Sequence, residues 1–265
     1  MNYVGNIHSF KIQNSLINYR IKALSHYRIF TYLYTMTVTQ ILLFLLAIFP
    51  GLLISYLIYR LDRYEKEPWW QLAICFALGV GMVWIAYHVE RMLGNSAYTM
   101  TVDMPGIVFT LLDAFVVVAF TEEILKFAVL RGYIFREEAF NEPMDGIVYA
   151  VLVAMGFATA ENIQYVMEGG WETGLVRMFT AVPAHGMLAV VMGYFLGIAK
   201  FESYDRPRLY FRGIALAVLG HGAYDFFILQ QFYPALAGLA LVLLIFGYRL
   251  SYKLIRLHQD DSPFK

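Results

Sequence analysis

Long apolar stretches, each about the length needed to cross a bilayer as a helix, follow one another through most of this sequence. A helix needs roughly 20 apolar residues to span the hydrocarbon core of a membrane. Measured against that length, the sequence predicts seven spans, at about 37–59, 69–89, 106–130, 144–167, 174–199, 209–229 and 235–255. Because the connections between them are short, we expect an all-α, polytopic transmembrane helix bundle that forms a single domain over 36–265.

The composition supports a membrane-embedded chain and excludes some functions. Of the 265 residues, 60% are hydrophobic and 15% are charged, whereas soluble domains average about half and about a quarter. The 20 basic and 20 acidic residues balance, which argues against a nucleic-acid partner, because such a partner favours a basic face. Cys75 is the single cysteine, so an internal disulfide and a thiolate metal cage are excluded. It lies in an apolar run.

The two ends of the chain and its loops bear on its placement in the cell membrane. Residues 1–35 are polar and loosely amphipathic, and we expect a tail or an interfacial helix there, unless translation begins at Met36. Lys and Arg concentrate in the odd-numbered loops and the C-terminal tail, and this bias sets orientation. Apart from the basic residues of the N-terminal tail, only Arg91 and Arg177 lie on the opposite side. The N-terminus is therefore predicted outside and the C-terminus in the cytoplasm.

Three ionisable residues, Glu122, Glu123 and Lys126, lie in the third predicted span. A charged residue at the centre of a span costs roughly 2.5–3.5 kcal/mol, so a structural role alone rarely justifies three. On a helix Lys126 can pair with either glutamate but cannot neutralise both. One carboxylate is then left protonated, or it faces another cation or a water-filled cavity. The simpler explanation is a salt-bridged helix end near the membrane surface.

The next three predicted spans also carry costly polar residues. Span four ends with Glu161 and Asn162, span five contains His185, and span six contains His221 and Asp225. His221 and Asp225 are four residues apart and share a helix face, so they can converge on one metal ion or bond one another. Taken singly, these residues have simpler explanations, such as a carboxylate that reaches the interface. Together they predict a buried polar centre.

Two further patterns in span five concern the helix itself. Pro183 is predicted to open the helix one turn below and to free a backbone carbonyl. Gly193 and Gly197 form a GxxxG pattern, which lets helices approach closely in lipid. The catalytic core is expected over about 106–229, the part of the chain that contains these features.

An ordered set of motifs resembles the PrsW family of intramembrane proteases. The motifs are Glu122-Glu123-x-x-Lys126, Asp145-Gly146 with Tyr149, GFATAEN ending at Asn162, Arg177, Pro183-Ala184-His185, GYFLG at 193–197, His221-x-x-x-Asp225 and the DRYEKEP loop at 62–68. The resemblance covers about residues 60–227. It implies an endopeptidase that cuts a single-span membrane protein, such as an anti-sigma factor. A more distant resemblance is to the CAAX prenyl endopeptidase and bacteriocin-immunity superfamily, whose motif spacing differs from that found here.

Peptide hydrolysis needs an activated water, a group that stabilises the oxyanion and a proton donor for the leaving amine. The cluster contains no Ser or Cys nucleophile, so we favour direct attack by water. Glu122 or Glu123 is the predicted general base, with Lys126 moderating the pair.

A divalent metal, for which we expect zinc, is the predicted cofactor. Its candidate ligands are His185 and His221 with Asp225 or Glu161. Asn162 is predicted to hold the oxyanion or the substrate backbone. In the metal-free alternative a glutamate activates water, and the histidines with Asn162 supply the oxyanion hole.

Two other classes of function stay open at this point. A proton-coupled transporter or an ion pathway also requires carboxylates, histidines and a lysine inside the membrane. The lack of an evident inverted repeat and the clustering in four consecutive spans argue mildly against transport. The last class is a non-catalytic relative that binds a partner span, although every candidate catalytic group is present.

Overall fold

The computed structural model describes residues 37–265, and every regular element within that range is helical. The predicted tail or interfacial helix at 1–35 lies outside the described residues. The elements are α3 (Val38–Leu61), α4 (Trp69–Thr101), α5 (Gly106–Leu112), the π-helix η2 (Asp113–Phe120), α6 (Thr121–Gly132), the short η3 (Ile134–Arg136), α7 (Pro143–Phe179), α8 (Ala181–Phe201), α9 (Arg206–Leu229), the short η4 (Pro234–Leu236) and α10 (Ala237–Asp260).

Five helices in the described part of the chain are long and apolar enough to cross a membrane. They are Val38–Leu61, Trp69–Thr101, Pro143–Phe201, Arg206–Leu229 and Pro234–Asp260. The third of these counts α7 and α8 together, and the segment 106–132 is divided among α5, η2 and α6. The all-α, multi-pass prediction is confirmed. Helices occupy all seven predicted stretches, but seven separate spans and their orientation stay predictions.

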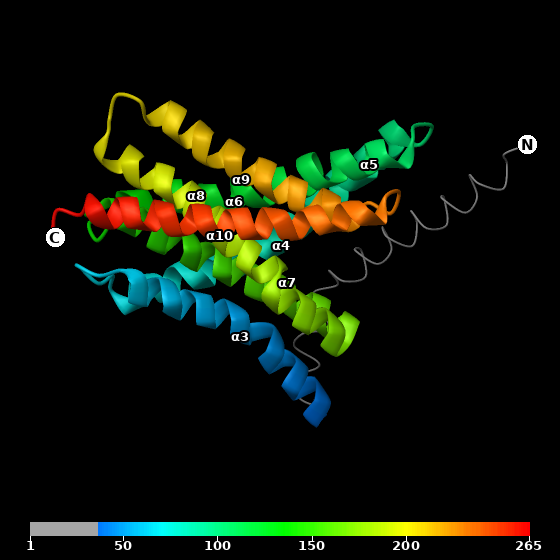
Figure 1. Ribbon diagram of the computed structural model, residues 1–265, viewed down its shortest axis with the longest axis horizontal. Coiled ribbons are helices and arrows are strands. Elements are labelled where there is room, and N and C mark those ends of the chain that lie inside the picture. The colour runs from blue at the N-terminus through cyan, green and yellow to red at the C-terminus, as the bar shows by residue number, and fades with distance from the viewer. Residues whose placement is uncertain (1–36) are drawn as a thin grey trace, which may run out of the picture.

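Helix α7 lies at the centre of the bundle and packs against α3, α4, α6, α8 and α10. Every residue from Met144 to Thr159 is buried, and a helix that is apolar all round belongs inside a bundle. Helices α8, α9 and α10 contact one another, and α3 lies against the opposite side of α7 (Figure 1). The outward faces of α3 and α10 expose many large apolar side chains, which suits a lipid environment.

The helical conformation is interrupted at two places, first within α7 and then between α7 and α8. Gly170 has φ +70° and ψ −157°, a conformation that glycine adopts far more readily than other residues, and it kinks α7. Thr180 (φ −125°, ψ −77°) then ends α7. Pro183 therefore lies in the first turn of α8, where its missing N–H has no intrahelical acceptor to lose. It does not open a continuous helix, because α8 begins at Ala181 rather than near residue 174.

The GxxxG pattern of α8 brings its backbone against that of α7. A Cβ atom added at Gly193 would lie 2.4 Å from the carbonyl oxygen of Gly146, and one at Gly197 would lie 2.3 Å from that of Pro143. These distances are too short for a side chain. The predicted close approach of helices is therefore present, and it fixes the position of α8 and of His185 within it.

Gly193→Ala is expected to destabilise the fold by roughly 1–3 kcal/mol, the usual cost of overpacking. Gly81→Ala in α4 is the matched control, because nothing lies within 4 Å of a Cβ atom built there. Thermal unfolding of the two variants in detergent measures the difference. Equal stability of both would contradict the tight contact between α7 and α8.

Candidate functional site

The ionisable residues of the third predicted span lie together at the start of α6, directly after the π-helix η2. Such π-helical segments often occur at functional sites. Glu122, Glu123 and Lys126 are all buried, with no more than 3% of each exposed. The ammonium nitrogen of Lys126 lies 2.7 Å from Glu123 Oε1 and 3.2 Å from Glu122 Oε2, so it contacts both carboxylates.

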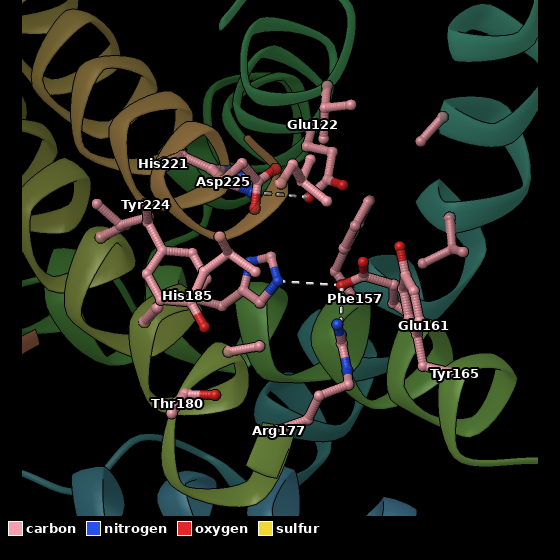
Figure 2. Close-up of a pocket in the computed structure, with 18 of the residues that line it drawn as sticks. Glu122, Phe157, Glu161, Tyr165, Arg177, Thr180, His185, His221, Tyr224 and Asp225 are labelled. Carbon is pink, nitrogen blue, oxygen red and sulfur yellow. Dashed lines mark hydrogen bonds and ion pairs between the residues drawn. The ribbon is translucent and has the colours of Figure 1, made fainter. Parts of the chain in front are cut away.

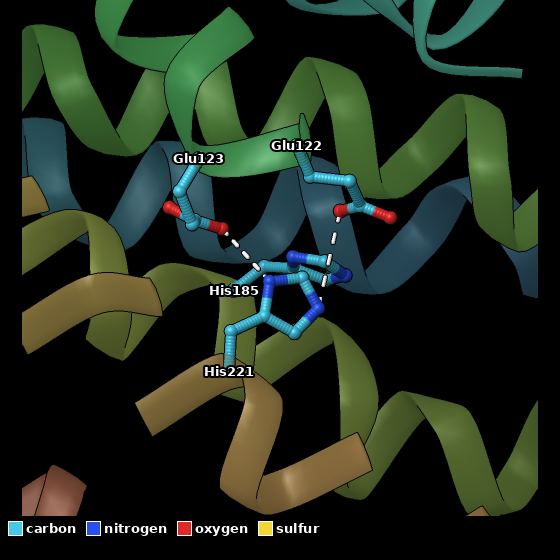
Figure 3. A group of neighbouring side chains, drawn as sticks. All are labelled: Glu122, Glu123, His185 and His221. Atoms are coloured by element: carbon cyan, nitrogen blue, oxygen red, sulfur yellow. Dashed lines mark hydrogen bonds and ion pairs between the residues drawn. The ribbon is translucent and has the colours of Figure 1, made fainter. Parts of the chain in front are cut away.

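Two histidines from neighbouring helices complete this buried cluster (Figure 3). In His221 of α9, the Nδ1 atom lies 2.9 Å from Glu123 Oε1, and the Nε2 atom lies 3.9 Å from Glu122 Oε2. His185 of α8 places Nδ1 3.2 Å from Lys126 Nζ. The two imidazole rings meet edge to face, with their centroids 5.1 Å apart. Predicted spans three, five and six therefore do converge on one centre.

This cluster has the donors that a divalent metal needs. Glu122, Glu123, His185 and His221 each offer one ligand atom, and these four atoms all lie within 4.8 Å of one another. Imidazole nitrogens combined with a carboxylate oxygen are a donor set of catalytic zinc sites. The Lys126 ammonium lies among three of these side chains, so the group already stabilises a positive charge. The residues present therefore fit a divalent cation.

The predicted ligands Glu161 and Asp225 lie beside this group of four rather than within it. Glu161 Oε2 is 3.1 Å from His185 Nε2, and Asp225 Oδ2 is 3.6 Å from His221 Nε2. The contact between Asp225 and His221 follows from their four-residue spacing on α9. A role for Glu161 or Asp225 as a metal ligand stays a prediction.

Arg177 lies beside Glu161 on the other side of the site (Figure 2), and it also contacts Asn162. Its Nη2 lies 3.2 Å from Glu161 Oε2, and its Nε donates a hydrogen bond of 2.8 Å to Asn162 Oδ1. The amide nitrogen of Asn162 in turn donates to the carbonyl oxygen of Ala47, at 2.9 Å. Both polar ends of the buried Asn162 side chain thus have protein partners. Its predicted contact with an oxyanion or a substrate stays untested.

A cavity of about 230 Å³ lies between the glutamate–histidine cluster and Arg177 (Figure 2). Much of its wall is apolar, and the groups of the site that face it are Glu122, Glu161, Arg177, His185, His221 and Asp225. Glu123, in contrast, is not among its lining residues. The cavity has room for several water molecules, each of which takes about 30 Å³ in the liquid. It is therefore a place where water can meet three carboxylates and two imidazoles.

Arg177 is the one residue of this arrangement that the sequence did not single out as functional. In the sequence Arg177 is a loop charge and part of a family motif, and its distance along the chain from Glu161 gives no periodic signal. The available signal was the pair Gly169-Gly170, which is typical of a turn. That turn lets the last part of α7 bring Arg177 back to Glu161.

Known proteins match the part of the chain that contains this site. A family model described as PrsW family intramembrane metalloprotease matches residues 67–250. A Protease PrsW of Bacillus subtilis is 34% identical over 182 residues, which cover 68% of this chain and 79% of the relative. The Protease PrsW of Geobacillus kaustophilus is 32% identical over 182 residues (69% and 77%), and that of Clostridioides difficile is 32% identical over 196 residues (72% and 80%). No solved structure matches this chain significantly.

Proposed function

Because the chain belongs to the PrsW family of intramembrane metalloproteases and is a peptidase, we propose that it cleaves a peptide bond of a single-span membrane protein, such as an anti-sigma factor, within the cavity between α4, α6, α7, α8 and α9. One observation carries the proposal. A largely apolar cavity inside a membrane bundle has the carboxylates of Glu122, Glu161 and Asp225 and two imidazoles in its wall. An apolar wall accepts a membrane segment, and the polar groups supply the chemistry of hydrolysis.

Glu122 is the proposed general base, because its carboxylate faces the cavity and that of Glu123 does not. It takes a proton from a water molecule in the cavity and later delivers a proton to the leaving amine. Glu123 is a positioning residue, since its carboxylate accepts a hydrogen bond from His221 Nδ1 and so directs Nε2 toward Glu122 and Asp225. Lys126 keeps the two carboxylates together.

His185 and His221, with Asp225 or Glu161 beside their Nε2 atoms, would hold the divalent metal, for which we expect zinc. Such an ion supplies Lewis acidity that acidifies a water and polarises the scissile carbonyl. In the metal-free alternative, the Lys126 ammonium remains the cation of the cluster and the imidazoles bind the oxyanion. The arrangement of Lys126 among Glu122, Glu123 and His185 supports keeping this alternative.

Cleavage of a tagged single-span protein by the purified chain in detergent tests the proposal. A peptidase cuts the substrate with no ion gradient, whereas a transporter needs sealed vesicles and shows pH-driven uptake without cleavage. We expect 1,10-phenanthroline to stop the reaction and added zinc to restore it. Cleavage that is insensitive to chelators would favour the metal-free alternative. The absence of cleavage across a panel of single-span proteins, together with pH-driven uptake, would overturn the proposal.

Arg177→Lys is expected to lower kcat/KM roughly tenfold to hundredfold, because Lys cannot contact Glu161 and Asn162 at once. One lost charged hydrogen bond is worth about 1.5–3 kcal/mol, and about 1.4 kcal/mol corresponds to a factor of ten in rate. Arg91→Lys is the matched control, since Arg91 is exposed on α4. Equal cleavage by both variants would show that Arg177 does not contribute to catalysis.

A further inference from the structure

A second group of carboxylates lies where the connection between α3 and α4 meets the start of α7. Glu65 and Glu67 belong to the connection, and Asp145 belongs to the first turn of α7. Each offers one oxygen, and the three oxygens all lie within 4.8 Å of one another. Glu67 is 2% exposed and Asp145 is fully buried. None of these residues lines the catalytic cavity.

The two oxygens of each buried carboxylate differ in their surroundings. Glu67 Oε2 accepts a hydrogen bond from the Tyr149 hydroxyl, and Asp145 Oδ2 accepts 2.8 Å hydrogen bonds from the backbone N–H groups of Asn141 and Glu142. No donor group in the described part of the chain reaches the buried oxygens Glu67 Oε1 and Asp145 Oδ1, and the two carboxyl groups lie close enough to one another to share a proton or a cation. A buried oxygen in that state is costly unless something neutralises it.

A further buried acid faces the same place. Asp62 ends α3 and is 1% exposed, yet neither of its carboxylate oxygens has a hydrogen-bond partner. Burial raises the pKa of Asp62 to about 7 against the attraction of Lys66, and the negative charges of Glu142, Asp145 and Glu65 contribute. Asp62 therefore adds a further buried acid to the group formed by Glu65, Glu67 and Asp145.

The neighbouring lysines attract these acids but form no ion pair with them. Lys66 is exposed, and its ammonium donates to the backbone carbonyls of Tyr59 and Asp62. Lys200 of α8 donates to backbone carbonyls of another loop. Within residues 37–265, no basic side chain forms an ion pair with Asp62, Glu67 or Asp145. What remains to neutralise them is a bound proton or a bound cation.

We propose that Glu65, Glu67 and Asp145 bind a divalent cation of the oxygen-preferring class, Mg²⁺, Mn²⁺ or Ca²⁺, at a site separate from the catalytic centre. The three donors are carboxylate oxygens, with neither sulfur nor imidazole among them, and such donors select hard cations. The ion joins the connection after α3 to the first turn of α7, the helix that carries Glu161. Its binding does not depend on the chemistry proposed for the cavity.

Titration of Mn²⁺ into the full chain in detergent tests this site. Binding is measured as the loss of the EPR signal of free Mn²⁺. Glu67→Gln keeps the size of the side chain and an acceptor for Tyr149, but removes a charged ligand. We expect this variant to bind one Mn²⁺ fewer than the wild type, or to bind it at least tenfold more weakly. His221→Ala, which alters only the catalytic cluster, should keep that ion, and Ca²⁺ should displace it.

Thermal unfolding of His221→Ala with and without Mn²⁺ keeps the test decisive if Glu67→Gln does not fold. Mn²⁺ is expected to raise the unfolding midpoint of His221→Ala, because an ion that binds only the folded chain stabilises it. Unchanged unfolding together with no bound Mn²⁺ would overturn the proposal and leave a shared proton as the neutralising group. Equal Mn²⁺ binding by the wild type and Glu67→Gln would overturn it as well. Neither result would affect the peptidase assignment.

Discussion

Glu122→Gln is expected to lower kcat/KM by roughly 10²–10⁴-fold, the contribution usual for a general base. The glutamine side chain has the same shape and can still accept a hydrogen bond from Lys126, 3.2 Å away in the wild type. It cannot take a proton from water. Because Glu122 faces the cavity, the loss falls on the chemical step, and the folded protein should still be found in the membrane.

Glu123→Gln is expected to abolish cleavage, because the variant no longer holds His221 in its wild-type position. The hydrogen bond of 2.9 Å between His221 Nδ1 and Glu123 Oε1 sets which ring nitrogen faces Glu122. Glu172→Gln, an exposed site on α7, is the matched control. All three variants are compared by cleavage rate at equal amounts of folded protein. Retention of wild-type cleavage by both Glu122→Gln and Glu123→Gln would refute the general-base assignment.

Lys126→Met is expected to destabilise the fold by roughly 3–5 kcal/mol, the usual result when one partner of a buried ion pair is removed. The wild-type ammonium contacts two buried carboxylates, at 2.7 and 3.2 Å. Without it, Glu122 and Glu123 are left as neighbouring buried acids with only His221 close to both. The variant should therefore unfold at a markedly lower temperature in detergent.

Three comparisons separate the lost charge of Lys126 from lost packing. Lys253→Met is the control, because Lys253 is exposed on α10. Adding Glu123→Gln to Lys126→Met removes one of the two unpaired acids and should restore part of the stability. Zinc should also stabilise Lys126→Met more than the wild type, since a bound cation replaces the missing charge. If Lys126→Met is as stable as Lys253→Met, the buried pairing contributes nothing.

Local signals in the sequence were enough to predict the helical bundle and the existence of its polar centre. Apolar runs of membrane-spanning length are a property of consecutive residues, and ionisable residues inside them stand out because of their cost. The spacing of His221 and Asp225 on one helix face likewise needed no tertiary information. The structure has a helix over each predicted stretch, and five of the helices or helix pairs can cross a membrane.

The arrangement inside the centre depends on tertiary structure and could not be predicted in full. The gap between the fourth and fifth predicted spans includes Gly170, but hydropathy does not show the break at Thr180, which lies inside the fifth predicted span. Depth along a span is uncertain by several residues when read from sequence. The sequence therefore could not show that Glu122 and Glu123, rather than Glu161 and Asp225, form one group with the two histidines.

Metal content is the most direct test of the central claim, that this buried cluster is the metal centre of a peptidase. The wild type and His221→Ala are purified in detergent without chelators, and zinc, manganese, cobalt, nickel and iron are measured by mass spectrometry. The account predicts about one zinc ion per wild-type chain, as in single-ion catalytic sites, and its loss from His221→Ala. Equal zinc in both proteins, or none of these metals in the wild type, would contradict it.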